Sequence, residues 1–577
     1  MPGEQRIRPF VAVLAIAVML ATVGCSSSSS SSSSSDGTQP PGTRPSNVVA
    51  PEGEPTDGGS VVVGVTSETD NWNPAFAQWA DAGNLVASSV YEPLYVYDKD
   101  GNTVPWLAVG AKANADFTEW TIEVRKGITF HDGTPMNAAS FVTSVTAGAK
   151  DGLSSLVLKA LVGEIRAIDE HTFVVTTTQP WPAFLNNLTT QIGIAAAPAM
   201  YVPEDKMKDH PVGTGAYRFE SWTPDKAFVT ARNDAYWGGP CAAPSPSEPV
   251  VKLCADMGVP LGRRNGPFLD SIEFRPLTDD DLRFSALKSG DIDLMFTTSP
   301  RNVPAGSTDL QVISDKESEK TFLQLNTKAP PLDNPHARKA LAYAAVPDDV
   351  ISVVSPDLAL TRDTSPYGSR GKWGLPPDQT GYVTPDLEKA KAEVEAYKKD
   401  TGKDALSFTM AAVANADDQA VLQLLQQQFE SAGIQTTIET VEQVSLITTL
   451  VGGRFESMLV RNYAYPEPDS MNVFFSEVSA KGPLFVNFSQ YATPEIDEAL
   501  VAARATADVS ARKAEYDKVA RLRNDAVTEV WLFDTPYTIL AKPEVHGLNP
   551  FRVIPWGNFV PKPFVTGIWK DRAGGGA

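Results

Sequence analysis

The sequence predicts an α/β protein built from several lobes. Two segments, Ile272–Met295 and Leu406–Val441, each have the pattern of a strand, an amphipathic helix and a second strand. This order implies parallel strands with the helix packed on the sheet. At 577 residues, of which 42% are hydrophobic, the chain is too long for one ordinary core, so we expect two to four lobes.

The N-terminal segment is a targeting signal rather than part of the fold. Arg6 and Arg8 precede the apolar run Phe10–Val23, which is too short to span a bilayer. Cys25 follows, as in a bacterial lipoprotein signal, although Thr22 departs from the aliphatic residue of that pattern. We therefore expect residues 1–24 to be removed and Cys25 to be lipidated; ordinary secretion with an incidental cysteine is the alternative.

Residues 25–58 have the composition of a flexible tether. Ten serines, Ser26–Ser35, are followed by a stretch rich in Pro, Gly and Thr. Such a composition cannot pack a core. Directly after a lipidated cysteine, it would let a folded body stand away from a membrane.

In the first half of the folded body, period-2 and β-branched runs predict strands, and 3.6-residue periodicity predicts helices. We expect strands at Gly59–Val65, Glu119–Val124, Phe173–Thr178, Ile272–Pro276 and Asp291–Met295, a hairpin around Phe219 and Ala227–Ala231, and helices at Thr134–Lys150, Trp181–Leu188 and Asp279–Ser289.

In the second half, Asp417–Ala432 is the clearest helix, because Val421, Leu425 and Phe429 form one apolar stripe and Gly433 suits a C-cap. The other expected helices are Pro335–Ala345, Pro385–Tyr397, Pro494–Ala505 and Ala511–Val530, and the expected strands are Thr321–Asn326, Leu406–Ala412, Ile434–Val441, Ser457–Val460 and Trp531–Ala541.

Cys241 and Cys254 form an even pair close in sequence in an exported chain, which indicates a disulfide. A metal site would need more ligands than this region offers, and it contains no histidine. Elsewhere the five histidines lack metal-ligand spacing. We therefore expect no bound metal and no cofactor.

No catalytic motif stands out, so we expect no enzyme. The chain lacks a GxSxG elbow and an HExxH pair, and Gly213–Gly215 is not a phosphate loop. His131 in the turn FHDG could act as a base, but a turn residue whose ring bonds the backbone is the plainer interpretation. A net charge of −21 argues against binding nucleic acid.

The stretch Arg461–Asp469 (RNYAYPEPD) follows the predicted strand Ser457–Val460. Its two prolines exclude a helix, and Tyr463 and Tyr465 supply rigid contact area with polar ends. In open α/β sheets, ligands bind beyond the carboxyl ends of strands. The stretch therefore indicates a cleft wall, with a surface turn as the alternative.

Four blocks resemble the family 5 extracellular solute-binding proteins, the peptide- and nickel-binding components of ABC importers. They are WTIEVRKGITFHDG at Trp120–Gly133, VGTGAYRFESW at Val212–Trp222, LDSIEFRPLTDDDLRFSALKSGDIDLM at Leu269–Met295 and LQLNTKAPPLDNPHARKALAYA at Leu323–Ala344. With weaker matches, the resemblance covers nearly the whole mature chain. It is specific for the family and says little about the ligand.

The resemblance implies a periplasmic-binding-protein-like type II fold, with two lobes joined by a hinge and an extra α+β subdomain. Lobe I would comprise residues 59–87, 205–322 and 533–577, the extra subdomain residues 88–204, and lobe II residues 323–532. The hinge strands would lie near Leu323–Asn326 and Trp531–Asp534. The cysteine pair would close an insertion on the surface of one lobe.

The resemblance also implies a ligand between the lobes. Trp72, directly after the first strand, would lie on the cleft floor or else pack in the core. The candidate ligand-binding residues are Trp72, Asn73, Asn326, Arg461, Asn462, Tyr463, Tyr465, Glu467 and Asp469.

One departure from the peptide-binding members concerns charge. Where those proteins carry an acid that receives the ammonium group of the peptide, this chain has Ala464. Either Glu467 or Asp469 substitutes, or the ligand lacks a free amine there. Arg461 would favour an anionic ligand or pair with a neighbouring acid.

We therefore expect a monomeric, lipid-anchored protein on the extracytoplasmic face of the plasma membrane. It would capture a peptide or peptide-like solute and deliver it to the permease subunits of an ABC importer. The alternatives are a sensor or scaffold of the cell envelope with the same fold, and a cell-surface hydrolase.

Overall fold

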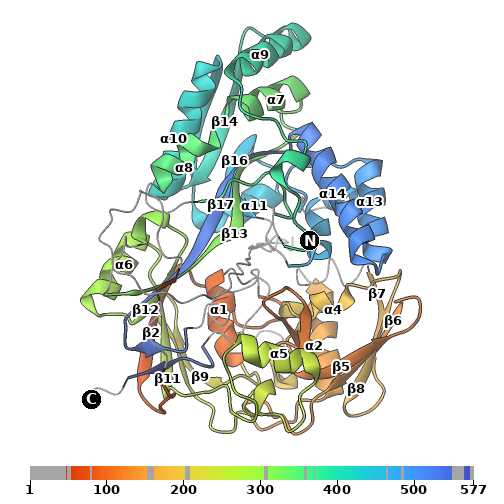
Figure 1. Ribbon diagram of the computed structural model, residues 1–577, viewed down its shortest axis with the longest axis vertical. Coiled ribbons are helices and arrows are strands. Elements are labelled where there is room, and N and C mark those ends of the chain that lie inside the picture. The colour runs from red at the N-terminus through yellow and green to blue at the C-terminus, as the bar shows by residue number, and fades with distance from the viewer. Residues whose placement is uncertain are drawn as a thin grey trace, which may run out of the picture.

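The computed structural model describes residues 47–48, 53–69, 71–77, 79, 81–151, 161–201, 208–303, 309–355, 360–368, 371–462, 466–481, 486–548 and 565–571. The signal segment, Cys25, Tyr463 and Tyr465 lie outside the described residues. Helices and strands are both abundant, as the α/β prediction requires (Figure 1).

One eleven-stranded sheet runs through the molecule (Figure 1). Ten of its strands lie in the order β15, β14, β16, β13, β17, β12, β2, β11, β10, β9, and β1 pairs with β13. Their bounds are β1 Asn47–Val48, β2 Ser60–Val65, β9 Tyr217–Thr223, β10 Ala227–Arg232, β11 Ser271–Pro276, β12 Leu294–Thr297, β13 Gln311–Leu325, β14 Leu406–Val413, β15 Ile434–Val441, β16 Ser457–Asn462 and β17 Glu529–Ala541.

The long strands β13 and β17 connect the two halves of the sheet. They pair antiparallel from Gln311 opposite Ala541 to Gln324 opposite Glu529. Strand β12 pairs with the lobe I part of β17, and β16 pairs with the lobe II part of β13. The two strands on which the hinge was expected therefore run from one lobe into the other. The expected strand at Thr321–Asn326 is only the end of β13.

Lobe I is built around β2, which lies parallel to both β11 and β12, as the strand–helix–strand pattern predicts. The antiparallel hairpin of β9 and β10 extends this half of the sheet. Helix α1 (Asp81–Val90) packs near the hairpin and α6 (Asp280–Ser289) near β12. Two short strands, β18 (Val545–His546) and β19 (Trp569–Lys570), form a separate pair.

The extra subdomain has its own antiparallel sheet in the order β5, β6, β8, β7, and its own hydrophobic core. Its elements are β3 Tyr95–Tyr97, β4 Thr103–Pro105, β5 Ala108–Ala113, β6 Glu119–Val124, α2 Ala138–Asp151, β7 Val162–Ala167, β8 Thr172–Thr177, α4 Phe184–Asn187, η1 Gln191–Gly193 and η2 Pro198–Tyr201.

The cysteine insertion belongs to this subdomain rather than to the surface of a lobe. In the structure Cys241 and Cys254 are bonded to each other, with an S–S distance of 2.10 Å, and both are buried. Cys241 lies in η3 (Pro240–Ala242) and Cys254 on α5 (Glu248–Asp256), whose apolar side packs into the core of the subdomain. The expectation of a surface insertion is therefore corrected, because its apolar side chains extend a neighbouring core.

Lobe II carries helices on both faces of β14, β15 and β16 (Figure 1). Strands β14 and β15 are parallel and are joined by α10, as the βαβ pattern predicts. The helices are α7 Pro335–Ala344, α8 Pro347–Val354, α9 Leu387–Thr401, α10 Ala416–Ser431, α11 Gln443–Val451, α12 Glu477–Lys481, α13 Pro494–Ala505 and α14 Val509–Ala526, with short 3-10 turns η4 Pro300–Asn302, η5 Pro377–Gln379 and η6 Pro468–Phe474.

The segment expected to be a tether contacts the folded body before residue 59. Asn47 and Val48 pair with β13, opposite Ile313 and Val312. This edge of β13 is free because β16 pairs only with the lobe II part of the strand. The amide of Gly58 also donates to the carbonyl of Phe268 at 2.8 Å. Parts of the expected tether therefore lie against the folded body.

Candidate functional site

The hinge strands carry a buried group of charges. Lys320 on β13 lies opposite Asp534 on β17, and its ammonium is 2.8 Å from the Asp534 carboxylate. Asp363, from a segment of lobe II beside these two strands, lies 3.5 Å from the same ammonium. All three side chains are buried. A buried charge is tolerated only with close partners, so this group fixes where the lobe II segment meets the hinge.

A second group surrounds Arg461 near the end of β16. Its guanidinium donates to Thr298 Oγ1 of lobe I at 3.1 Å and lies 3.9 Å from Asp418 at the start of α10. Burial raises the pKa of Glu319 on β13 to about 8, with Arg461 acting against the rise and Asp418 adding to it. The role of Arg461 as a partner of a neighbouring acid is thus present in the structure.

The first turn of α10 makes the next contact between the lobes. Asn415 caps the helix by accepting from the Asp418 amide at 2.8 Å. Asp417 accepts from Ser299 Oγ at 2.7 Å and pairs with Arg301, both from lobe I. Asp417 therefore faces lobe I, and Asp418 faces Arg461 at the end of β16.

Glu467 and Asp469, at the other end of the Arg461–Asp469 stretch, already have partners. Glu467 pairs with Arg512 of α14, and Asp469 pairs with Arg504 of α13 at 2.7 Å. Burial raises the pKa of Glu467 to about 7, while Arg512 lowers it. The Glu467 carboxylate also accepts weakly from the Asp469 amide, at the start of η6.

Asp469 also reaches across to the extra subdomain. The indole N–H of Trp181 donates to Asp469 Oδ2 at 2.7 Å, and the guanidinium of Arg504 lies 5.4 Å from the Trp181 ring. Arg461 at the end of β16 thus contacts lobe I, and Asp469 in η6 contacts the extra subdomain.

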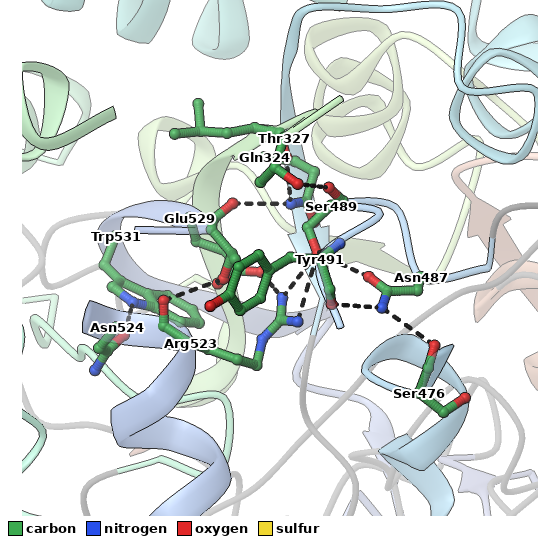
Figure 2. A network of polar contacts seen from close by, with 12 residues as sticks. Gln324, Thr327, Ser476, Asn487, Ser489, Tyr491, Arg523, Asn524, Glu529 and Trp531 are labelled. Atoms are coloured by element: carbon green, nitrogen blue, oxygen red, sulfur yellow. Dashed lines mark hydrogen bonds and ion pairs between the residues drawn. The ribbon is translucent and has the colours of Figure 1, made fainter. Parts of the chain in front are cut away.

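A buried polar network anchors lobe II behind the hinge (Figure 2). Arg523 at the end of α14 pairs with Glu529, the first residue of β17, and both are 1% exposed. Asn524 accepts from the indole N–H of Trp531 at 2.9 Å. These contacts tie the beginning of β17 to α14. Further along, the register of β13 and β17 shifts between Thr321 and Phe322 and again between Asp315 and Glu319.

Two sequence-predicted residues lie inside lobe I. Trp72 is 2% exposed and packs against the rings of Phe228, Trp222 and Trp79. Asn73 donates to the carbonyl of Met200 at 3.0 Å and caps its own turn. The core alternative therefore describes Trp72 better than a place on the cleft floor.

Asn326 also lies away from the Arg461 group. The antiparallel register places Leu325 opposite Ser457, at the start of β16, and Lys320 opposite Asn462, at its end. Asn326 is thus about 20 Å along the strand from Lys320. Its amide donates to the carbonyls of Gly453 and Phe455, so it organises a loop within lobe II.

Asn462, in contrast, is buried at the end of β16 beside Lys320. Arg461 and Asn462 thus lie on the end of β16 beside the hinge charges, whereas Glu467 and Asp469 pair with Arg512 and Arg504. Tyr463 and Tyr465 fall between them in sequence and lie outside the described residues.

Several residues of this region were not predicted from the sequence. They are Trp181, Asp363, Lys320, Arg504, Arg512 and Asp534. Arg504 and Arg512 lie in amphipathic helices. The sequence of such a helix does not show whether an arginine is paired inside the protein or faces solvent. Trp181 offered a signal, since it stands alone between two prolines in QPWPAF.

The family model for "Bacterial extracellular solute-binding proteins, family 5 Middle" matches residues 102–482, more than half of the chain. The chain belongs to this family. Family 5 solute-binding proteins serve ABC importers, and this membership sets the chain among binding proteins outside the cytoplasm rather than among enzymes. The prediction of the family from its motifs is confirmed.

Individual relatives are distant. The glutathione-binding protein GsiB of Pectobacterium atrosepticum is 25% identical over 480 residues, which cover 80% of this chain and 85% of that protein. The structure resembles DppA from Helicobacter pylori in complex with the peptide STSA, with a TM-score of 0.73 at 20% identity, covering 90% of this chain and 99% of that one. NikZ from Campylobacter jejuni in complex with Ni(L-His) gives a TM-score of 0.69 at 18% identity, covering 85% and 95%. These likenesses confirm the type II fold.

The described part of this family 5 protein contains no helix that is both long and apolar enough to cross a membrane. It also contains no group of three or more His, Cys, Asp or Glu side chains placed to hold a metal ion. His131, the one histidine considered as a base, bonds the backbone: its Nε2 lies 2.9 Å from the carbonyl of Gly215. This is the turn role that the sequence favours.

Proposed function

We propose that this family 5 protein encloses a peptide or peptide-like solute between lobe II and the surface formed by lobe I and the extra subdomain. One observation carries this proposal: the Arg461–Asp469 stretch contacts Thr298 at its start and Trp181 at its end. Separation of the lobes would break both contacts, so a solute bound here would couple its binding to closure. The glutathione and peptide named for relatives support a peptide-like solute.

The charges of the site refine the proposal. Glu467 and Asp469, the two acids that could replace the acid missing at Ala464, are paired with Arg512 and Arg504. An acid already paired with an arginine inside the protein is a poor partner for a second cation, because the arginine would lose its own partner. We therefore propose that the solute does not place a free ammonium group against this stretch.

Titration calorimetry with trialanine, N-acetyl-trialanine and glutathione tests both statements. The proposal expects at least one of these probes to bind with a one-to-one stoichiometry, and the acetylated tripeptide to bind no more than about threefold more weakly than the free-amine form. Tight binding of trialanine alone, unchanged in a Glu467→Gln, Asp469→Asn double variant, would contradict the statement about the ammonium group.

We further propose that Cys25 carries a lipid anchor, that the protein acts as a monomer delivering its solute to ABC permease subunits, and that the Cys241–Cys254 bond forms on export. Peptide mass mapping of the full chain from membranes should find a lipidated Cys25 at the N-terminus and no free thiol at 241 or 254. A Cys25→Ala chain should leave the membrane fraction. Free thiols at both positions, or membrane retention of the variant, would contradict these proposals.

A further inference from the structure

Lys252, on the disulfide-closed insertion, faces the turn between β3 and β4 in the extra subdomain. Helix α5 begins and ends within the insertion, and Cys254 on this helix is bonded to Cys241. Because Val250, Leu253 and Cys254 are buried in the core of the subdomain, the opposite side of α5 is set in position. That side carries Lys252, close to the turn that links β3 and β4.

The ammonium of Lys252 forms salt bridges with three carboxylates. It lies 2.8 Å from Asp98, 2.8 Å from Asp100 and 3.2 Å from Asp256, the last on its own helix. Asp98 and Asp100 belong to the β3–β4 turn. The hydrogen bond from Lys252 lowers the pKa of Asp100, and it also helps to lower the pKa of Asp98 against the effect of burial. Lys99 also pairs with Asp100 at 2.8 Å, but Lys252 is the cation that Asp98, Asp100 and Asp256 share, and its removal would increase the repulsion among them.

The shape of the turn depends on the same carboxylate. Asp98 Oδ1 accepts from the amides of Asp100 and Asn102, each at 2.9 Å. Gly101 between them has a φ of +72°, which suits glycine. Its backbone is thereby held at the tip of the turn in one fixed orientation.

The tip of the turn contacts lobe II. The carbonyl of Gly101 accepts from the ammonium of Lys372 at 3.0 Å. Pro466, within the Arg461–Asp469 stretch, lies so close that a Cβ placed on Gly101 would be 3.5 Å from the proline Cβ. Backbone position, rather than a side chain, therefore makes this contact between the subdomain and lobe II. The contacts of Gly101 with Lys372 and Pro466 therefore form only when the turn is held in this position.

We infer that Lys252 is a positioning residue of the lobe interface: the insertion uses it to hold the Asp98–Asn102 turn against Lys372 and Pro466. The insertion thereby stabilises the arrangement in which the extra subdomain and lobe II are together. This inference rests on the proposed capture of solute between the lobes, but the contact itself requires no ligand. It gives the insertion a role beyond packing.

Hydrogen–deuterium exchange of the full chain, without ligand, tests the inference. In Lys252→Met, amides of residues 98–102 and of residues 466–474 in lobe II should exchange about five- to tenfold faster than in the wild type. Lys252→Arg, which keeps the charge, should restore most of the protection. Lys513→Met is the matched control, since Lys513 pairs with Asp517 at 2.8 Å within α14 and should leave both regions unchanged.

A double-variant comparison keeps the test decisive. Lys372→Met removes the lobe II side of the same contact, so adding Lys252→Met to it should produce little further exchange at residues 466–474. Faster exchange confined to α5 and residues 98–102, or fully additive effects of the two variants at residues 466–474, would overturn the inference. Because no solute is involved, this result is independent of whether a peptide-like ligand is found.

Discussion

The indole N–H of Trp181 donates a 2.7 Å hydrogen bond to the carboxylate of Asp469, although 288 residues separate them in the chain. Trp181 belongs to the extra subdomain, and Asp469 ends the stretch that begins at Arg461. Both side chains are buried. The bond joins the extra subdomain to lobe II, and the proposed capture of a solute between the lobes would require it to break when they separate.

Trp181→Phe should weaken this contact while Trp120→Phe should not. Both tryptophans lie in the core of the subdomain and neighbour Phe184, with ring centroids 5.4 Å and 6.0 Å away, but the indole N–H of Trp120 has no hydrogen-bond partner within the described structure. A bond to a charged acceptor is worth about 1.5–3 kcal/mol. Trp181→Phe should therefore lower the free energy of unfolding by roughly 1–2 kcal/mol more than Trp120→Phe, as measured by urea denaturation. Equal losses would show that the bond contributes nothing.

Arg512→Met should destabilise the protein more at high pH than at low pH. Burial already raises the pKa of Glu467 to about 7, and Arg512 works against this rise. Removing one partner of a buried pair costs about 3–5 kcal/mol, and the cost falls when the remaining acid can take up a proton. Unfolding free energies near pH 6 and pH 8.5 should show the larger loss at the higher pH. Arg512→Lys serves as the control that keeps a positive charge, and a loss independent of pH would argue against a buried, ionised Glu467.

Glu319 should make folding less favourable as pH rises. Its pKa is raised by burial from an ordinary value of 4.5 to about 8, so between these values the folded chain holds a proton that the unfolded chain releases. Across this window, the wild type should lose stability relative to Glu319→Gln as the pH increases. Unfolding curves at several pH values measure the difference, and parallel dependences in the two proteins would contradict the assignment.

His131 should give a dependence of the opposite sign. Burial lowers its pKa from 6.5 to about 4, so between these values the unfolded chain binds a proton that the folded chain does not. The wild type should therefore lose stability relative to His131→Gln as the pH falls from about 6.5 to 4. A glutamine amide can still donate to the carbonyl of Gly215, so the comparison isolates the titration. If the difference stays constant over this range, His131 does not titrate in the folded chain as described.

The sequence could predict the regular elements wherever local signals agree. The strand Ile434–Val441 and the helix Pro494–Ala505 have the predicted bounds, since Gly433 ends one element and Pro494 begins the other. The start of β13 was missed because Ser314–Lys320 is polar and lacks a period-2 hydrophobic pattern. Its strand conformation is imposed by pairing with β17, which sequence periodicity does not reveal.

The site was predictable only in part. The stretch after β16 could be proposed from the sequence, because its composition and its place at the end of a strand both indicate a binding loop. The partners of that stretch were not found, because Trp181 and Arg512 come from distant segments that tertiary folding brings together. The sequence also could not show where Asn326 lies relative to Arg461, because the antiparallel register of β13 and β16 places these two residues near opposite ends of the pairing.

Native mass spectrometry of the freshly purified full chain tests the central claim, capture of a peptide-like solute, most directly. The account predicts one non-covalently bound peptide or peptide-like compound per chain, released unchanged on denaturation and rebound when added back. A chain that carries no solute when taken from cells grown in peptide-rich medium, and that rebinds none of the peptides supplied to it, would contradict the account.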